Sequence, residues 1–222
     1  MLNIAGARAL AAALGLSAAL AFASCGGQTQ TGNFDAGNAN ANVRRGVKPE
    51  PDAEAAVIEV ESGGVPYGRL VVELYPNVAP KHVERFKTLA RAGFYNGVAF
   101  HRVEPNVIQG GDPLSKDDDP ANDGTGGSDY PDLPAEFSDI PYEAGVVGAA
   151  RSSDPNSANS QFFVTLARTP QWDNNYTVFG RVVEGLTQAR IISGAPTRPG
   201  TTNPDPRIVM KSVTLQPRAN FK

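Results

Sequence analysis

A second cysteine is absent from this chain of 222 residues, so no internal disulfide can form and the fold must rest on its hydrophobic core. A basic tract is absent as well: 20 lysines and arginines stand against 23 acidic residues, for a formal charge of −3. This balance argues against nucleic acid as a partner, because nucleic acid binds strongly basic surfaces. Internal repeats are also lacking, and the length suits one well-packed domain with additional segments.

The first residues indicate the compartment. Arg8 precedes an apolar stretch from Ala9 to Ala23, which is too short and too early for an ordinary transmembrane helix and is typical of a secretory signal peptide. Small residues stand directly before Cys25, and the run FASCG resembles the lipobox at which bacterial lipoprotein precursors are cleaved and acylated. The resemblance implies a lipid anchor on Cys25 and a place in the cell envelope, on the extracytoplasmic side of a membrane. The alternative is a stray thiol without function.

Composition divides the chain into three parts. Residues 1–24 are the predicted signal peptide. Residues 25–52 consist mainly of Gly, Asn, Ala, Thr and Gln, which bury too little apolar surface to offset the entropy of ordering, so we predict a flexible tether that starts at lipidated Cys25. Regular hydrophobic patterning follows, and residues 53–222 are the predicted globular domain.

Hydrophobic periodicity predicts many short strands and two helices. The β-rich runs 57–61 and 68–75 flank a Ser-Gly-Gly turn and predict a hairpin. Val83, Phe86 and Leu89 form one apolar face of a predicted helix over 79–92, and a second helix fits 184–193. Further short apolar runs lie at 98–103, 107–109, 145–150, 162–166, 177–183 and 208–215. This pattern favours a β-barrel or β-sandwich.

The densest group of chemically informative residues is FHRVEPNVIQGGD at 100–112, followed by SQFF at 160–163. Together with GFYNG at 93–97 and YTVFG at 176–180, these motifs resemble the cyclophilin family of peptidyl-prolyl cis-trans isomerases over about residues 55–215. The resemblance implies a mainly β fold, a closed eight-stranded antiparallel barrel capped by two α-helices. That architecture agrees with the strands and helices indicated by periodicity.

The resemblance also implies which residues do the chemistry. Arg102 matches the catalytic arginine, Gln109 and Gln161 match the residues that orient the arginine and the substrate carbonyl, and Phe163 matches the floor of the proline pocket. Rotation about a prolyl bond meets a barrier of about 20 kcal/mol but breaks no covalent bond, so we expect neither metal nor cofactor. The expected partners are proline-containing polypeptides of exported proteins and the membrane, and we expect a monomer.

The chain departs from the family pattern around the pocket. It is one residue shorter between Arg102 and Gln109, so Val107 takes the second apolar position and the phenylalanine that walls the pocket is missing. We hypothesise that Trp172, at a pocket-lining leucine position, replaces this wall. The other substituted positions of the groove are Tyr176, Arg151 and Ser152. The shortened segment leaves an alternative open, a catalytically weak module that binds proline-containing peptides or acts as a chaperone.

Three polar features of the sequence are interpreted as structural or surface features without a catalytic or metal-binding role. We expect His101 to be a hydrogen-bonded core or structural residue with no catalytic role, and His82 to lie on the surface of the first helix. The acidic run 117–119 belongs to a long loop, in which Ala121 and Tyr130 stand where a calcium loop needs oxygen ligands. We therefore predict a solvated loop there.

Overall fold

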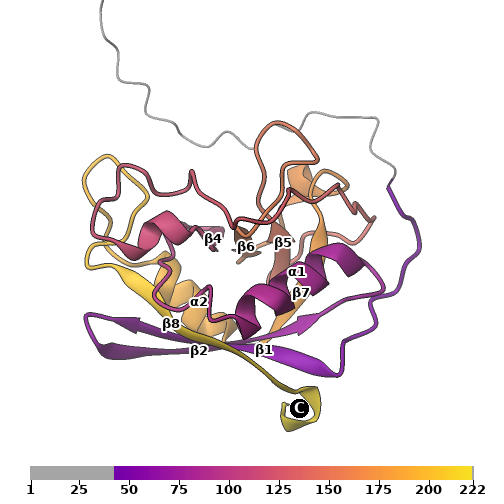
Figure 1. Cartoon of the computed structure of the whole chain (residues 1–222), viewed down its shortest axis with the longest axis horizontal. Coiled ribbons are helices and arrows are strands. Elements are labelled where there is room, and N and C mark those ends of the chain that lie inside the picture. Colours follow the sequence, from indigo (N-terminus) through magenta and orange to yellow (C-terminus); the bar gives the residue numbers. More distant parts are fainter. Residues whose placement is uncertain (1–42, 222) are drawn as a thin grey trace, which may run out of the picture. The chain divides into compact units, whose positions relative to one another are not determined.

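The computed structural model describes residues 43–221, which form an eight-stranded antiparallel sheet with two α-helices (Figure 1). Within these residues no helix has the length and apolar character needed to cross a bilayer. The predicted signal peptide and Cys25 lie outside them. The helices are α1 (Pro80–Arg91) and α2 (Leu186–Ser193), and the strands are β1 (Glu54–Ser62), β2 (Val65–Leu74), β3 (Arg102–Glu104), β4 (Val107–Gly110), β5 (Val146–Ala149), β6 (Phe162–Thr165), β7 (Val178–Glu184) and β8 (Ile208–Pro217).

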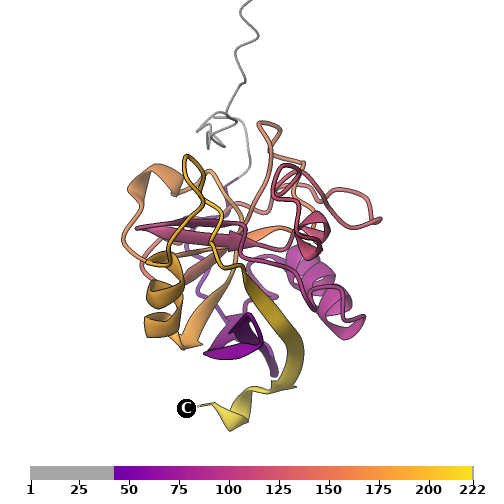
Figure 2. The ribbon, with the colours of Figure 1, turned by 90° about the vertical axis from the view of Figure 1, so that its left-hand side faces the viewer.

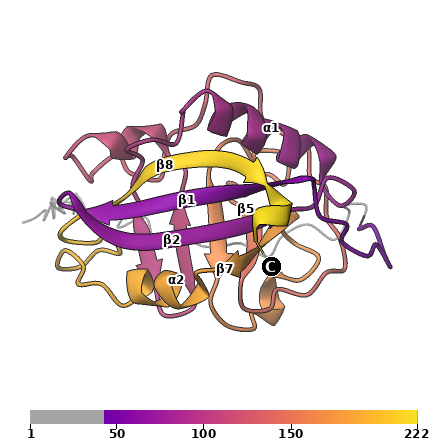
Figure 3. The same ribbon diagram turned by 90° about the horizontal axis from the view of Figure 1, so that it is seen from below.

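The sheet follows the order β3-β4-β6-β5-β7-β2-β1-β8 and curls back on itself. Figure 3 shows β8, β1 and β2 crossing in front of β5 and β7. The two end strands meet through a bridge between Ala99, which precedes β3, and Val209 in β8. Next to it, the Phe100 N–H donates to the Ile208 carbonyl at 2.9 Å. The predicted fold class is therefore confirmed, with closure by this short bridge in place of a continuous ladder.

The two helices lie on opposite sides of the curled sheet (Figure 2). Phe86 lies on the buried face of α1 and packs against Tyr95 and Phe162, with ring centroids 5.1 and 5.6 Å apart. The apolar spacing in 79–92 thus predicts the buried face of α1. Burial of one such ring contributes about 1.5–3 kcal/mol to folding.

Part of the predicted tether packs against the domain. The Arg44 N–H donates to the Phe137 carbonyl at 2.9 Å, and its guanidinium donates to the carbonyls of Val78 and Asn77 at 2.8 and 3.0 Å. Val47 packs against the same apolar cluster as Val78. The contacts of the domain therefore begin before the predicted boundary at 53, because hydrogen bonds to distant carbonyls hold a segment that is poor in apolar residues.

His82 is buried rather than on the surface, with only 4% exposure. Its Nδ1 lies 2.7 Å from Oε2 of Glu136, and the same carboxylate accepts the backbone N–H groups of Lys81 and His82 at 3.3 and 3.2 Å. Ala79, the N-cap residue of α1, offers no side-chain acceptor. Glu136, from a distant loop, therefore accepts the free backbone N–H groups at the N-terminus of α1. Its negative charge at this end of the helix also complements the helix dipole.

We expect Glu136→Gln to lower the free energy of unfolding at pH 7 by about 1–3 kcal/mol. Burial opposes ionisation of Glu136, but the bonds from the His82 ring and the two N–H groups outweigh it and lower the pKa of Glu136. A lowered folded-state pKa gives stability that is complete above the unfolded value of about 4.3 and lost as the pH falls through the folded value. Urea unfolding at pH 7 and below pH 4 measures both effects.

The control for this prediction is Glu59→Gln on an exposed position of β1. It should leave the urea midpoint and its pH dependence unchanged. Equal stability of Glu136→Gln and wild type at pH 7 would contradict the proposed cap.

Candidate active site

Strand pairing places the motif residues in one row across the sheet. Arg102 in β3 lies opposite Gln109 in β4, Gln109 lies opposite Phe163 in β6, and Phe163 lies opposite Gly148 in β5. Directly opposed residues of antiparallel strands project from the same face. The row therefore brings the predicted arginine, one predicted glutamine and the predicted pocket floor to one face of the sheet.

Phe162 and Phe163 project from opposite faces of β6. Phe162 belongs to the large core that includes Phe86 of α1, whereas Phe163 belongs to a separate buried cluster. We call this second cluster the site cluster. Its members include Val107, Tyr142, Phe163, Trp172, Tyr176 and Val178. The alternation along β6 thus separates the core of the fold from the candidate site.

Arg102 is held by a carboxylate from its own strand. Its Nε donates to Oε1 of Glu104 at 2.8 Å, and the arginine side chain is 16% exposed. Residues two apart in a strand share a face, which explains how the two side chains meet. Sequence reasoning missed Glu104, although the alternation in a strand at 102–104 was a signal that could have found it.

The two glutamines contact each other and a neighbouring loop. Gln109 Nε2 donates to Gln161 Oε1 at 2.9 Å, and Gln161 Nε2 donates to the carbonyls of Gly124 and Gly126 at 3.0 and 2.8 Å. Gln109 Oε1 is buried, and among residues 43–221 it has no hydrogen-bond partner. Gln109 therefore lies opposite Arg102 and orients Gln161, while the arginine Nε is engaged by Glu104.

Aromatic rings surround Phe163, which is 0% exposed. Its ring centroid lies 4.9 Å from that of Trp172 and 5.6 Å from those of Tyr142 and Tyr176. A Cβ built on Gly148 would lie 2.6 Å from Tyr142 Oη and against the Phe163 ring, so only glycine fits beneath this ring. The structure places Trp172 against the predicted pocket floor, as the hypothesis of a replaced wall requires.

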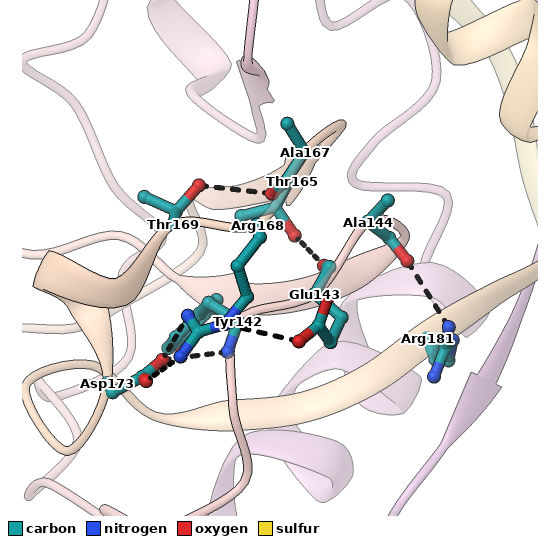
Figure 4. A network of polar contacts seen from close by, with 9 residues as sticks. All are labelled: Tyr142, Glu143, Ala144, Thr165, Ala167, Arg168, Thr169, Asp173 and Arg181. Atoms are coloured by element: carbon teal, nitrogen blue, oxygen red, sulfur yellow. Dashed lines mark hydrogen bonds and ion pairs between the residues drawn. The ribbon is translucent and has the colours of Figure 1, made fainter.

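A polar network fixes the segment that carries Trp172 (Figure 4). Asp173 accepts from the Tyr142 N–H at 2.9 Å and from Nη1 of Arg168 at 2.9 Å. Arg168 also pairs with Glu143, with 3.1 Å between Nε and Oε1. Tyr142 was missed at the sequence level because it lies in an irregular segment without periodicity. The network joins that segment to the loop that follows β6.

The predicted outer-groove residues lie at the edge of the site cluster. The Arg151 guanidinium lies 4.5 Å from the centroid of the Tyr176 ring and donates to the Asn175 carbonyl at 2.9 Å. The Ser152 hydroxyl lies 2.7 Å from the Ser157 hydroxyl in an exposed loop. Arg151 is thus packed beside the cluster, whereas the Ser152 hydroxyl contacts its own loop.

His101, next to Arg102, is buried as the sequence predicts, but among residues 43–221 neither of its ring nitrogens has a hydrogen-bond partner. Burial, partly opposed by the charge of Asp112, lowers the pKa of His101 to about 4. The ring is therefore neutral at neutral pH and offers no acid for the chemistry.

Comparison with known proteins gives consistent results. The model of the family "Cyclophilin type peptidyl-prolyl cis-trans isomerase/CLD" matches residues 57–215. A probable peptidyl-prolyl cis-trans isomerase of Brucella suis is 50% identical over 145 residues, which cover 62% of this chain and 74% of the relative. The isomerase ppi1 of Schizosaccharomyces pombe is 39% identical over 152 residues, which cover 67% of this chain and 94% of the relative.

The fold has a similar counterpart among solved structures. A crystal structure of a cyclophilin type peptidyl-prolyl cis-trans isomerase of Cryptosporidium parvum, in the presence of the dipeptide Ala-Pro, matches with a TM-score of 0.64 and 27% sequence identity. The match covers 73% of this chain and 98% of that chain. The likeness therefore extends over nearly all of the parasite protein.

Proposed function

The chain belongs to the cyclophilin family and is a peptidyl-prolyl cis-trans isomerase, and we propose that Arg102 is the group that stabilises the twisted prolyl amide during the reaction. The observation that carries this assignment is the row Arg102–Gln109–Phe163 on one face of the sheet. It sets a guanidinium beside an amide and an aromatic pocket residue, a set suited to bind a peptide bond and the ring that follows it.

The mechanism follows from the electronic change during rotation. A twisted amide loses conjugation, so its nitrogen regains a lone pair that can accept a hydrogen bond. A fixed guanidinium donates a stronger hydrogen bond to the prolyl nitrogen of the twisted amide than to that of either planar isomer. The transition state is therefore bound more tightly than the ground states, and the rotation is accelerated. No bond is broken and no proton is transferred. Since a guanidinium keeps its charge at all relevant pH values, we expect catalysis to vary little with pH near neutrality.

The proposed substrates are proline-containing polypeptides. The Ala-Pro dipeptide named with the parasite structure supports this class. We propose that the prolyl ring is bound at Phe163, with Trp172 in place of the missing aromatic wall and Val107 beside it, because all three belong to the site cluster. As the family resemblance implies, Gln109 and Gln161 are proposed to orient Arg102 and the substrate carbonyl, and Tyr176, Arg151 and Ser152 to contact the neighbouring residues.

The decisive experiment is a protease-free measurement of prolyl isomerisation with the purified full-length chain and its Arg102 variants. A wild type no faster than uncatalysed exchange would contradict the activity and favour a module that only binds proline peptides. Catalysis that survives loss of the guanidinium would contradict the mechanism.

We further propose that residues 1–24 export the chain and that acylated Cys25 anchors it to a membrane, where it acts on exported proteins whose slow prolyl steps limit folding. The support is the lipobox-like run before Cys25. In bacteria fed labelled palmitate, the wild-type chain should take up label and sediment with membranes, and Cys25→Ser should do neither. Equal labelling of both, or a wild type found only in the soluble fraction, would contradict the anchor.

A further inference from the structure

We infer that Glu104 is a positioning residue for Arg102, an inference that rests on the proposed role of this arginine in catalysis. The direct observation is the contact of 2.8 Å between Arg102 Nε and Glu104 Oε1. Because donor and acceptor are both charged, this bond is stronger and more directional than a bond between neutral groups. Neither the family motifs nor the proposed mechanism assigns a task to this carboxylate.

The shortened hairpin places Glu104 on the site face. Glu104 lies opposite Val107, and these two residues flank the two-residue turn Pro105–Asn106 between β3 and β4. Val107 belongs to the site cluster and is 2% exposed. The last residue of β3 therefore projects toward the same face as Arg102, at a distance that its side chain can span.

The glutamine expected to orient the arginine is engaged elsewhere. Gln109 Nε2 donates to Gln161, and Gln109 Oε1 has no hydrogen-bond partner among the residues that the structure describes. The group that accepts the hydrogen bond from Arg102 Nε is instead the carboxylate of Glu104. Orientation of the guanidinium thus depends on a carboxylate of its own strand as well as on the pairing between β3 and β4.

A bond at Nε has a specific geometric effect. The guanidinium is planar with its five N–H donors in fixed directions, so an acceptor on Nε sets the direction of the two terminal amino groups. Glu104 acts through Arg102 without touching the reacting amide. The side chains of Arg102 and Glu104 are 16% and 39% exposed, so the pair is partly open to solvent on the face of the site row.

The test is a double-substitution cycle in the full-length chain, with kcat and KM from protease-free exchange on a short Xaa-Pro peptide. Glu104→Ala should lower kcat about 10-fold with little change in KM, because a misplaced catalytic group costs up to about 100-fold. Glu104→Gln keeps an acceptor and should recover kcat to within about threefold of wild type. In the Arg102→Ala background, at raised enzyme concentration, Glu104→Ala should have no further effect.

The matched control is Glu184→Ala, which removes an ion pair with Arg69 in which Nη2 and Oε1 lie 2.6 Å apart, away from the site row. It should leave kcat unchanged. Unchanged or raised kcat in Glu104→Ala, or the same loss with and without Arg102, would overturn the positioning role while leaving the role of Arg102 intact. Full activity of Arg102→Ala would instead overturn the proposed function.

Discussion

Arg102→Ala is expected to lower kcat/KM for a proline-containing peptide by about 100-fold or more, the usual loss when one donor to a transition state is removed. The reason is that the guanidinium is the charged donor in the row that also contains Gln109 and Phe163. The fold should survive, because Arg102 lies outside the hydrophobic core clusters and its ion pair with the partly exposed Glu104 is worth about 1 kcal/mol. Protease-free exchange measurements give the rate, and circular dichroism checks the fold.

A second strand arginine serves as the control for this prediction. Arg181 lies in β7 and is exposed, and its guanidinium donates to the Ala144 carbonyl at 3.4 Å. Arg181→Ala should keep the wild-type rate. An Arg102→Ala chain within threefold of wild type would show that shape and aromatic contacts alone catalyse the rotation.

Phe163→Ala is expected to lower the free energy of unfolding by about 3–5 kcal/mol, the range for loss of a buried phenylalanine ring. The ring is 0% exposed and contacts Tyr142, Trp172 and Tyr176, so its removal leaves a cavity among rings that the polar network holds in place. For a domain of this size the melting temperature should fall by roughly 10 °C. Thermal unfolding followed by circular dichroism measures it, and KM for the peptide should rise.

Phe94→Ala is the matched control, because Phe94 is only partly buried and packs edge-on against Tyr95, with 5.3 Å between centroids. It should cost less stability and leave KM unchanged. A Phe163→Ala chain as stable as Phe94→Ala would contradict the packing described for the site cluster.

Trp172→Leu separates the contribution of the site cluster to peptide binding from its contribution to folding. If Trp172 is the proposed wall, the variant should bind the peptide less tightly than wild type while folding normally, since leucine fills most of the space but offers no ring to Phe163. The affinity is measured by titrating the peptide into each protein and following amide chemical shifts, which do not depend on tryptophan fluorescence. Equal or faster catalysis by Trp172→Leu would contradict the proposed wall.

Much of the fold could be predicted because its signals are local. The predicted hairpin at 57–61 and 68–75 corresponds to β1 and β2, and the helix expected over 79–92 corresponds to α1. The second helix was expected from Glu184, but Glu184 ends β7, and α2 begins only after Gly185, whose φ of 92° interrupts regular structure. Hydrophobic periodicity thus locates the helix well. Its first residue depends on how far the preceding strand β7 stays paired with its neighbours.

The candidate site was predictable only in part. The motifs at 100–112 and 160–163 indicated Arg102, Gln109, Gln161 and Phe163, and the structure brings these residues to one region. The individual roles of these residues stay predictions. Glu104 and Tyr142 were missed, because the importance of each comes from a contact and not from its residue type.

The sequence by itself determined the chemistry that is available: the strand and helix periodicities, the arginine and glutamine motifs, and the missing phenylalanine before Gln109. Only the tertiary structure decided that Glu136 caps α1, that Arg44 binds carbonyls of a distant loop, and that Glu104 engages Arg102. The physical reason is that periodicity depends on neighbours in the chain, whereas a hydrogen bond depends on which atoms the folded backbone brings within about 3 Å of each other.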